Sequence, residues 1–180
     1  MRIISGKYKG KRLLAPKNLP VRPTTDMAKE GLFNILSNRY DIPQLTILDL
    51  FTGTGNISFE FASRGAKAIT AIDAHWRCVK FVKATALELA MSITTVKSDA
   101  ETFLKRCSNS YDIIFADPPY DFGKEALVPL IDLVLENRIL RPSGQLIIEH
   151  PTQVYLNDHD HFHESRKYGS SVFSFFGNSM

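Results

Sequence analysis

Cysteine is scarce in this sequence, and long apolar runs are absent. The 180 residues include two cysteines, Cys78 and Cys107, which are too few and too far apart for a disulfide framework or a zinc site. We therefore expect a reducing, cytoplasmic environment and no bound metal. No run approaches the roughly 18 apolar residues that a membrane span needs, and the polar N-terminus lacks the core of a signal peptide. The sequence predicts a soluble protein without a membrane partner.

Acidic side chains are missing from residues 1–25, which carry seven Lys and Arg. The other 15 Lys and Arg are outnumbered by 19 Asp and Glu, so the formal net charge of +3 combines a basic segment with a mildly acidic body. We predict a basic N-terminal extension over residues 1–25 and a globular domain over residues 26–180. The cations of the extension either bind the phosphates of a nucleic acid or only solvate a hairpin.

The first 40 residues predict three short elements. Residues 2–14 have β-type runs on either side of Gly6-Lys7, which is typical of a hairpin, and three prolines within residues 15–23 indicate an irregular tether. Apolar residues at helical spacing then predict an amphipathic helix over residues 26–39.

Strands and helices alternate through most of the remaining chain, and a pair of β-type runs ends it. This alternation predicts βαβ units, and therefore an α/β fold with a mostly parallel sheet whose ligands bind at the carboxyl ends of the strands. The last two runs predict an antiparallel hairpin. We expect strands over residues 47–52, 68–73, 93–97, 112–116, 145–149, 162–168 and 172–176, and helices over residues 56–64, 75–90, 99–107 and 124–137.

A glycine-rich turn follows the first of these strands. Glycines in such a turn let the backbone bend sharply and let a ligand approach it closely. An acidic residue ends the second strand, where its carboxylate can accept hydrogen bonds from both hydroxyls of a ribose. The pairing predicts a nucleoside cofactor, with a purely structural turn as the alternative. The candidate cofactor-binding residues here are Asp49, Phe51, Gly53, Gly55, Asn56, Asp73 and Ala74.

The identity of two residues favours S-adenosyl-L-methionine over a nicotinamide dinucleotide. The dinucleotide pattern G-x-G-x-x-G/A has Ser58 at its last position here. Asp49 has no role beside a pyrophosphate, whereas its carboxylate suits the ammonium group of a methionine moiety. Asp99 and Ala100, after the third strand, extend the predicted site to the adenine, although Asp99 also suits a helix N-cap and both roles are compatible.

The fourth strand ends in Asp117-Pro118-Pro119-Tyr120. A carboxylate, a rigid pair of prolines and an aromatic ring form a slot for a planar amine, with Asp117 and the Pro118 carbonyl accepting its N–H groups and Tyr120 stacking on the ring. Holding the amine in line with a methyl donor supplies most of the catalysis as proximity and orientation. We assign these four residues as catalytic and Asp117 also as a cofactor-binding residue; an ordinary Pro-Pro turn is the alternative.

Five segments form a combined pattern: Arg2 to Gly6, Arg22 to Asp26, Lys29 to Asn34, Asp49 to Gly55, and Asp117 to Tyr120. Together they resemble the bacterial small-subunit ribosomal RNA guanine-N2 methyltransferases, and the resemblance extends over essentially the whole chain. It implies a Rossmann-like class I methyltransferase with a seven-stranded sheet, S-adenosyl-L-methionine as donor, and one guanine of 16S ribosomal RNA as acceptor.

The resemblance also implies roles for the N-terminal residues. Arg22 and Thr24 are expected to fold over the cofactor or the RNA, and the basic side chains of the extension to meet phosphate, with Tyr8 stacking on an unpaired base. One departure from the family is Asn56, where a small residue is usual. The candidate RNA-binding residues are Lys7, Tyr8, Lys9, Lys11, Arg12 and Arg22.

Two further patterns receive structural interpretations. His159, His161 and His163 alternate as metal ligands can, but no matching ligand set exists elsewhere and we expect a solvated loop. Trp76 and Phe81 are expected to be packing residues, with a contact to adenine as the alternative for Trp76 or His75.

Other functions stay open from sequence alone. The amine slot also suits an adenine-N6 methyltransferase acting on DNA or RNA, and the fold suits a non-catalytic RNA-binding assembly protein. A dehydrogenase is a more distant alternative. For the favoured function, the partner is ribosomal RNA, either naked or within a small-subunit assembly intermediate.

Overall fold

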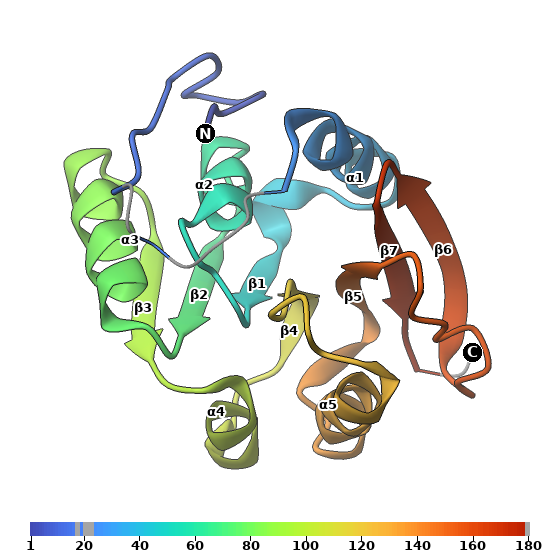
Figure 1. Cartoon of the computed structure of the whole chain (residues 1–180). Helices are drawn as coiled ribbons and strands as arrows, with labels where there is room; N and C mark the ends of the chain where they lie inside the picture. Colours follow the sequence, from blue (N-terminus) through green and yellow to red (C-terminus); the bar gives the residue numbers. More distant parts are fainter. Residues whose placement is uncertain (17–18, 20–23, 179–180) are drawn as a thin grey trace.

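The computed structural model describes residues 1–16, 19 and 24–178 and contains a seven-stranded sheet of order β3-β2-β1-β4-β5-β7-β6 (Figure 1). The first five strands are parallel, and β7 and β6 add an antiparallel hairpin, which confirms the predicted fold. The strands are β1 (Thr46–Asp49), β2 (Ala68–Asp73), β3 (Ile93–Lys97), β4 (Tyr111–Ala116), β5 (Leu140–Pro151), β6 (Phe162–Tyr168) and β7 (Ser171–Phe176).

Helices cover both faces of this sheet. Helices α1, α2 and α3 lie on one face, and α4 and α5 lie on the other (Figure 1). Of the described residues, none belongs to a helix that is long and apolar enough to cross a bilayer. The helices are α1 (Asp26–Arg39), α2 (Asn56–Ser63), α3 (Trp76–Glu88), α4 (Ala100–Arg106) and α5 (Lys124–Glu136), with a short 3₁₀ turn η1 (Ile42–Gln44) before β1.

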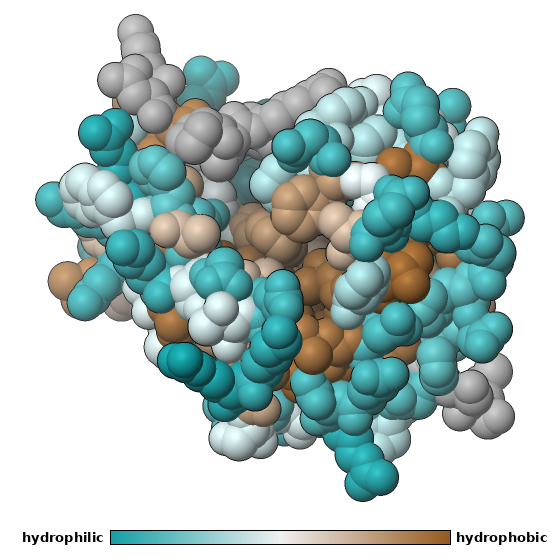
Figure 2. Space-filling model, turned by 60° about the horizontal axis from the view of Figure 1, so that its bottom comes forward, coloured by the Kyte–Doolittle hydropathy of each residue, from teal (hydrophilic) through white to brown (hydrophobic). Residues whose placement is uncertain are grey.

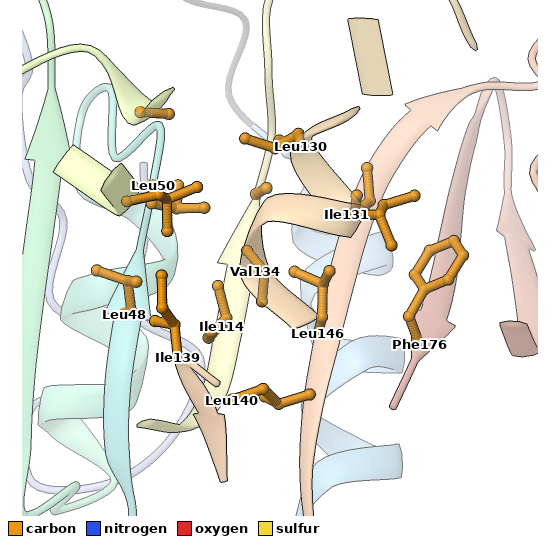
Figure 3. Packing of buried hydrophobic residues seen from close by; sticks show 14 of the residues in the cluster. Leu48, Leu50, Ile114, Leu130, Ile131, Val134, Ile139, Leu140, Leu146 and Phe176 are labelled. Carbon is orange, nitrogen blue, oxygen red and sulfur yellow. The ribbon is translucent and has the colours of Figure 1, made fainter. Parts of the chain in front are cut away.

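Alternation along the central strands explains why both faces are apolar. In β1, Ile47 packs toward α1 and α2, whereas its neighbour Leu48 packs toward α4 and α5. Both side chains are fully buried, as expected for a parallel sheet covered on two sides. Figure 3 shows the α5 side of this core, where Ile131 and Val134 meet side chains of β1, β4 and β5.

The N-terminal extension is docked on α2 and α3. The predicted hairpin is reduced to one antiparallel bridge, between Arg2 and Arg12, because the chain between them is occupied by turns. Ile3 and Leu13 are buried in a cluster with Val82 of α3. The extension therefore shares a hydrophobic core with the body.

Candidate functional site

A cavity of about 800 Å³ lies at the carboxyl ends of β1, β2, β4 and β5, where the topology predicts a ligand. Figure 2 shows an apolar hollow bordered by hydrophilic side chains on the face that this end of the sheet presents. Ligand cavities of this size hold small molecules. The predicted site residues that line it are Thr24, Asp49, Phe51, Gly53, Asn56, Asp73, Ala74, Asp99, Ala100, Asp117, Pro118, Pro119 and Tyr120. Arg22 lies outside the described residues.

Asp49 is a buried carboxylate at the end of β1, with 1% of its surface exposed. Its Oδ2 accepts hydrogen bonds from the hydroxyls of Ser58, at 2.6 Å, and Thr52, at 2.9 Å. Burial raises the pKa of Asp49 from 3.8 to about 6, while these two hydrogen bonds oppose the shift. No cation within the described part of the chain forms an ion pair with it. The site is therefore favourable for a cationic ligand.

The glycine-rich turn is tied to the end of β2. Gly53 N–H donates to Asp73 Oδ2 at 2.8 Å, and His75 N–H donates to Asp73 Oδ1 at 2.7 Å. Each carboxylate oxygen keeps a further acceptor site, since an ionised carboxylate has about four. Asp73 is thereby held in place and can still accept from ligand hydroxyls.

Gly55 does not line the cavity but begins α2 in a left-handed conformation, with φ of 79°. A Cβ there would lie 2.6 Å from the Phe59 ring and 2.9 Å from Val82 Cγ2. A side chain is thus excluded both by the backbone conformation and by the packing of α2 against α3.

Asn56 lines the cavity, but both ends of its amide have protein partners. Its Nδ2 donates to the Thr24 carbonyl at 2.9 Å, and its Oδ1 accepts from Lys29 Nζ at 2.8 Å. Thr24 Oγ1 in turn donates to Glu149 Oε2 at 2.8 Å, at the end of β5. The amide connects the segment before α1 to α2, a task that a small residue could not perform.

Asp99 caps α4, as one of its two predicted roles requires. Its Oδ1 accepts from Thr102 N–H at 2.8 Å, and this hydrogen bond lowers the pKa of the Asp99 carboxyl. Ala100 beside it is buried and lines the cavity. Because Asp99 can cap α4 while Ala100 lines the cavity, the predicted contact of this pair with adenine stays compatible with the structure.

The Asp117 loop forms the opposite side of the cavity from Asp73 along the sheet, because β4 and β2 flank β1. Pro118 is buried, whereas Tyr120 is 57% exposed at the rim. Phe122 N–H donates to the Pro119 carbonyl at 2.9 Å, and the Phe122 ring packs edge-on against Phe51 at 6.0 Å. The loop is thereby packed against the turn that follows β1.

The C-terminal hairpin and the start of α1 complete this side of the cavity. Tyr168, Ser170 and Met27 line it, and the Tyr168 ring occupies the space left by Gly31 of α1, where a Cβ would lie 2.3 Å from Cε1. The sequence pattern around Gly31 indicated no such contact. Only the pairing of β6 with β7 brings a residue 137 positions later against α1.

A buried charge cluster joins the N-terminal extension to α1 and α2. Lys29 Nζ donates to the Arg2 carbonyl at 2.7 Å and lies 3.5 Å from Glu60 Oε2, and both side chains are almost fully buried. Glu60 also accepts from the backbone N–H groups of Ile4, at 2.8 Å, and Ser5, at 3.0 Å. Burial lowers the pKa of Lys29, while Glu60 opposes the shift.

The predicted RNA-binding residues that the structure describes lie on the extension, and none of them lines the cavity. The side chains of Lys7, Lys9, Lys11 and Arg12 are exposed. Tyr8 is partly buried, and its hydroxyl donates to the Leu89 carbonyl. The hydroxyl of Tyr8 is therefore engaged in docking, and the stacking role stays a prediction.

The predictions for Phe81, Trp76 and the histidine-rich segment around His159 differ in outcome. Phe81 packs edge-on against Phe59, as predicted, but Trp76 is 52% exposed, so the prediction that it is a packing residue is wrong. The reason is that the buried residues of α3, among them Val82 and Ala86, lie on the other side of the helix from Trp76. Among residues 1–16, 19 and 24–178, no three His, Cys, Asp or Glu side chains gather as metal ligands. The prediction of a solvated loop is wrong for His159, because its side chain is only 9% exposed and contacts Asp132 at 3.0 Å.

Sequence reasoning missed Glu149 and misread Ser58. Ser58 counted only as a departure from the dinucleotide pattern, whereas the structure makes it a donor to Asp49. Its position three residues after Gly55, on the first turn of α2, was the signal that could have identified it. Glu149 is the last acidic residue of a predicted strand, as Asp49 and Asp73 are, and that shared position was available in the sequence.

The family model described as conserved hypothetical protein 95 matches residues 1–177. Ribosomal RNA small subunit methyltransferase D of Escherichia coli is 34% identical over 151 residues, covering 83% of this chain and 74% of that relative. The putative rRNA methyltransferase YlbH of Bacillus subtilis is 36% identical over 162 residues, covering 87% and 85%. The solved putative methyltransferase yhhF of Escherichia coli matches with a TM-score of 0.85 and 28% identity, over 98% of this chain and 96% of that chain. The predicted methyltransferase fold is confirmed.

Proposed function

The chain belongs to the family of conserved hypothetical protein 95, and from this premise we propose that it methylates the exocyclic N2 amine of a guanine in small-subunit ribosomal RNA. The observation that carries the proposal is the single cavity that brings Asp49 and Asp73 together with the Asp117 loop. The names of its relatives support ribosomal RNA as the substrate class.

The cofactor side of the cavity fits S-adenosyl-L-methionine. Asp49 offers a buried carboxylate to the ammonium group, and Asp73 offers acceptor sites to the ribose hydroxyls. His75 Nδ1 is a buried polar atom that lacks a hydrogen-bond partner within the described residues, and His75 lines the cavity beside Asp73, where it can pair with a polar atom of the nucleoside. When bound, the cofactor supplies an electrophilic methyl group on a sulfonium.

The Asp117 loop positions the acceptor. An exocyclic amine on a purine is a weak nucleophile, because its lone pair is delocalised into the ring. Asp117 and the Pro118 carbonyl accept hydrogen bonds from its two N–H groups, which localises that lone pair and holds it in line with the methyl group. Tyr120, exposed at the rim, stacks on the base after the nucleotide has left its helix, at a cost of a few kcal/mol for unstacking.

The experiment is methyl transfer by the full chain from tritiated S-adenosyl-L-methionine to ribosomal RNA and to small-subunit particles from a strain lacking this protein. The labelled nucleoside is identified by mass. We expect N2-methylguanosine; N6-methyladenosine would overturn the acceptor, and absence of any transfer would overturn the enzymatic function.

The role of Asp117 is tested by Asp117→Ala, with Asp121→Asn as the matched control because Asp121 is an exposed carboxylate in the same loop. We expect kcat to fall at least about a hundredfold in Asp117→Ala, since the amine loses its charged acceptor, and to stay within twofold in the control. Calorimetry should show that both variants still bind the cofactor. Wild-type transfer by Asp117→Ala would show that another group positions the amine.

A further inference from the structure

Trp76 is the one tryptophan of the chain, and 52% of its surface is exposed. It is the first residue of α3, and its neighbours His75 and Cys78 both line the cavity. Burying an indole is favourable by several kcal/mol, so an indole that is half exposed beside a ligand site offers a large flat apolar surface to a partner.

The surroundings of Trp76 are cationic. Arg77 and Lys80 lie over its ring, at 5.9 and 5.6 Å from the centroid. Lys83 follows one turn later, and all three side chains are exposed. No acidic residue occurs between Ala74 and Leu87, and none of the three cations has an ion-pair partner in the part of the chain that the structure describes.

The N-terminal extension contacts the buried face and the C-terminal end of α3. The Tyr8 hydroxyl donates to the Leu89 carbonyl just beyond the end of α3, and Ile3 and Leu13 pack against Val82. The 13 residues of α3 span about 20 Å at 1.5 Å per residue. The exposed cations of α3 thus lie along the helix between its C-terminal end, which the extension contacts, and its N-terminal end, where His75 lines the cavity.

We propose that the outer face of α3, formed by Trp76, Arg77, Lys80 and Lys83, is a second RNA-binding surface of this protein. Trp76 stacks on an unpaired base next to the target nucleotide, and the three cations neutralise the phosphates that lead from it toward the extension. Charge complementarity selects RNA over an apolar or basic protein partner. The inference rests on the proposed function, because it takes the substrate to be RNA.

The first test uses the fluorescence of the single tryptophan. Full-length protein is titrated with a single-stranded RNA oligonucleotide carrying a fluorescein label, so that anisotropy reports binding and Trp76 emission reports stacking. We expect RNA to quench Trp76 and to protect it from acrylamide at the same concentrations that raise the anisotropy. Binding without any change in Trp76 emission or acrylamide access would overturn the proposal while leaving the proposed function intact.

The second test separates the aromatic contribution from the charges. Trp76→Ala should weaken RNA binding about tenfold or more without changing its salt dependence, and Trp76→Phe should recover most of the affinity, because a stacked base needs only an aromatic face. Lys80→Ala should lower the slope of log K against log salt by about 0.7, the value for one phosphate contact on a single strand. Lys105→Ala is the control, because Lys105 lies on α4, on the other face of the sheet, and pairs with Glu101.

Cofactor affinity, measured by calorimetry, should be unchanged in all four variants. Equal RNA affinity for Trp76→Ala and the wild type, or an unchanged salt slope for Lys80→Ala, would overturn the proposal. A wild-type protein that binds no RNA by anisotropy would overturn the RNA substrate itself, which is a failure of the proposed function and distinguishable from the first two outcomes.

Discussion

At the level of one residue, the buried carboxylate of Asp49 can pair with a cationic ligand, but its ionisation lowers the unfolding free energy of the ligand-free protein. Its carboxylate is buried and accepts two hydroxyl hydrogen bonds, but desolvation still raises its pKa to about 6. In the unfolded chain the ordinary value near 3.8 applies. The folded state therefore holds the proton more tightly, and the unfolding free energy falls as the pH rises from about 4 to 6.

We predict that Asp49→Asn stabilises the cofactor-free protein at pH 7.5. The rise in the pKa of Asp49 from 3.8 to about 6 corresponds to roughly 3 kcal/mol. The asparagine Oδ1 can still accept from Ser58 and Thr52. Thermal unfolding of both proteins between pH 4 and 8 measures the effect. The difference in Tm should be largest above pH 6 and shrink toward pH 4, and a Tm difference independent of pH would contradict a role for the ionised carboxylate.

The same carboxylate predicts how cofactor binding depends on pH. A cationic ligand favours ionised Asp49, so the affinity for S-adenosyl-L-methionine should weaken as the pH falls below about 6, by up to tenfold per pH unit. Calorimetric titrations between pH 5 and 8 measure it. Asp49→Asn serves as the comparison, since its weaker binding should lose this pH dependence; an identical profile in both proteins would place the titration elsewhere.

At the level of elements, the contacts of the extension depend on a close approach of two backbones. Gly6 adopts a φ of 81°, and a Cβ there would lie 1.9 Å from the Ser63 carbonyl oxygen at the end of α2. Lys7 N–H donates to that same oxygen at 2.7 Å. Because the obstacle is backbone, it cannot rotate away as a flexible side chain would.

We predict that Gly6→Ala detaches the extension, with Gly10→Ala as the matched control. Gly10 has nearly the same φ, 83°, but nothing lies within 4 Å of a Cβ built there. Gly6→Ala should lower the Tm by several degrees more than the control and speed tryptic cleavage after Lys9 at least about tenfold. Equal cleavage rates in the two variants would mean that backbone strain alone, common to both glycines, governs docking.

The alternation of strands and helices was predictable from sequence because hydrophobic periodicity is a local signal. The turn after β1 and the Asp117 loop were predictable for the same reason, since each combines special backbone residues with a carboxylate at a strand end. Contacts between distant segments were not predictable from the sequence. Neither the burial of Lys29 against Glu60 nor the Tyr168 ring over Gly31 leaves a local pattern, because each depends on which elements pack together.

At the level of the whole molecule, the positive and negative charges occupy different places. The exposed cations of the extension and α3 face outward, whereas Asp49, Asp73 and Asp117 gather at one cavity. The division into residues 1–25 and 26–180 stays a prediction about chain organisation. The contacts of the extension determine whether it unfolds separately from the body.

We predict that the extension and the body unfold in a single transition. Ile3, with 2% of its surface exposed, and Leu13, with 7%, share a cluster with Val82, and the Lys29–Glu60 pair would lose its partners Arg2, Ile4 and Ser5 if the extension detached. A buried pair deprived of partners costs about 3 kcal/mol or more, so partial opening is disfavoured. Melts followed by circular dichroism, by Trp76 emission and by protection of Lys9 from trypsin should coincide.

In Gly6→Ala the trypsin transition should separate from the other two and occur at lower temperature. Early loss of protection in the wild type would instead show that the extension opens independently, because its hydrogen bonds to Glu60 would then contribute less than the entropy of the released chain.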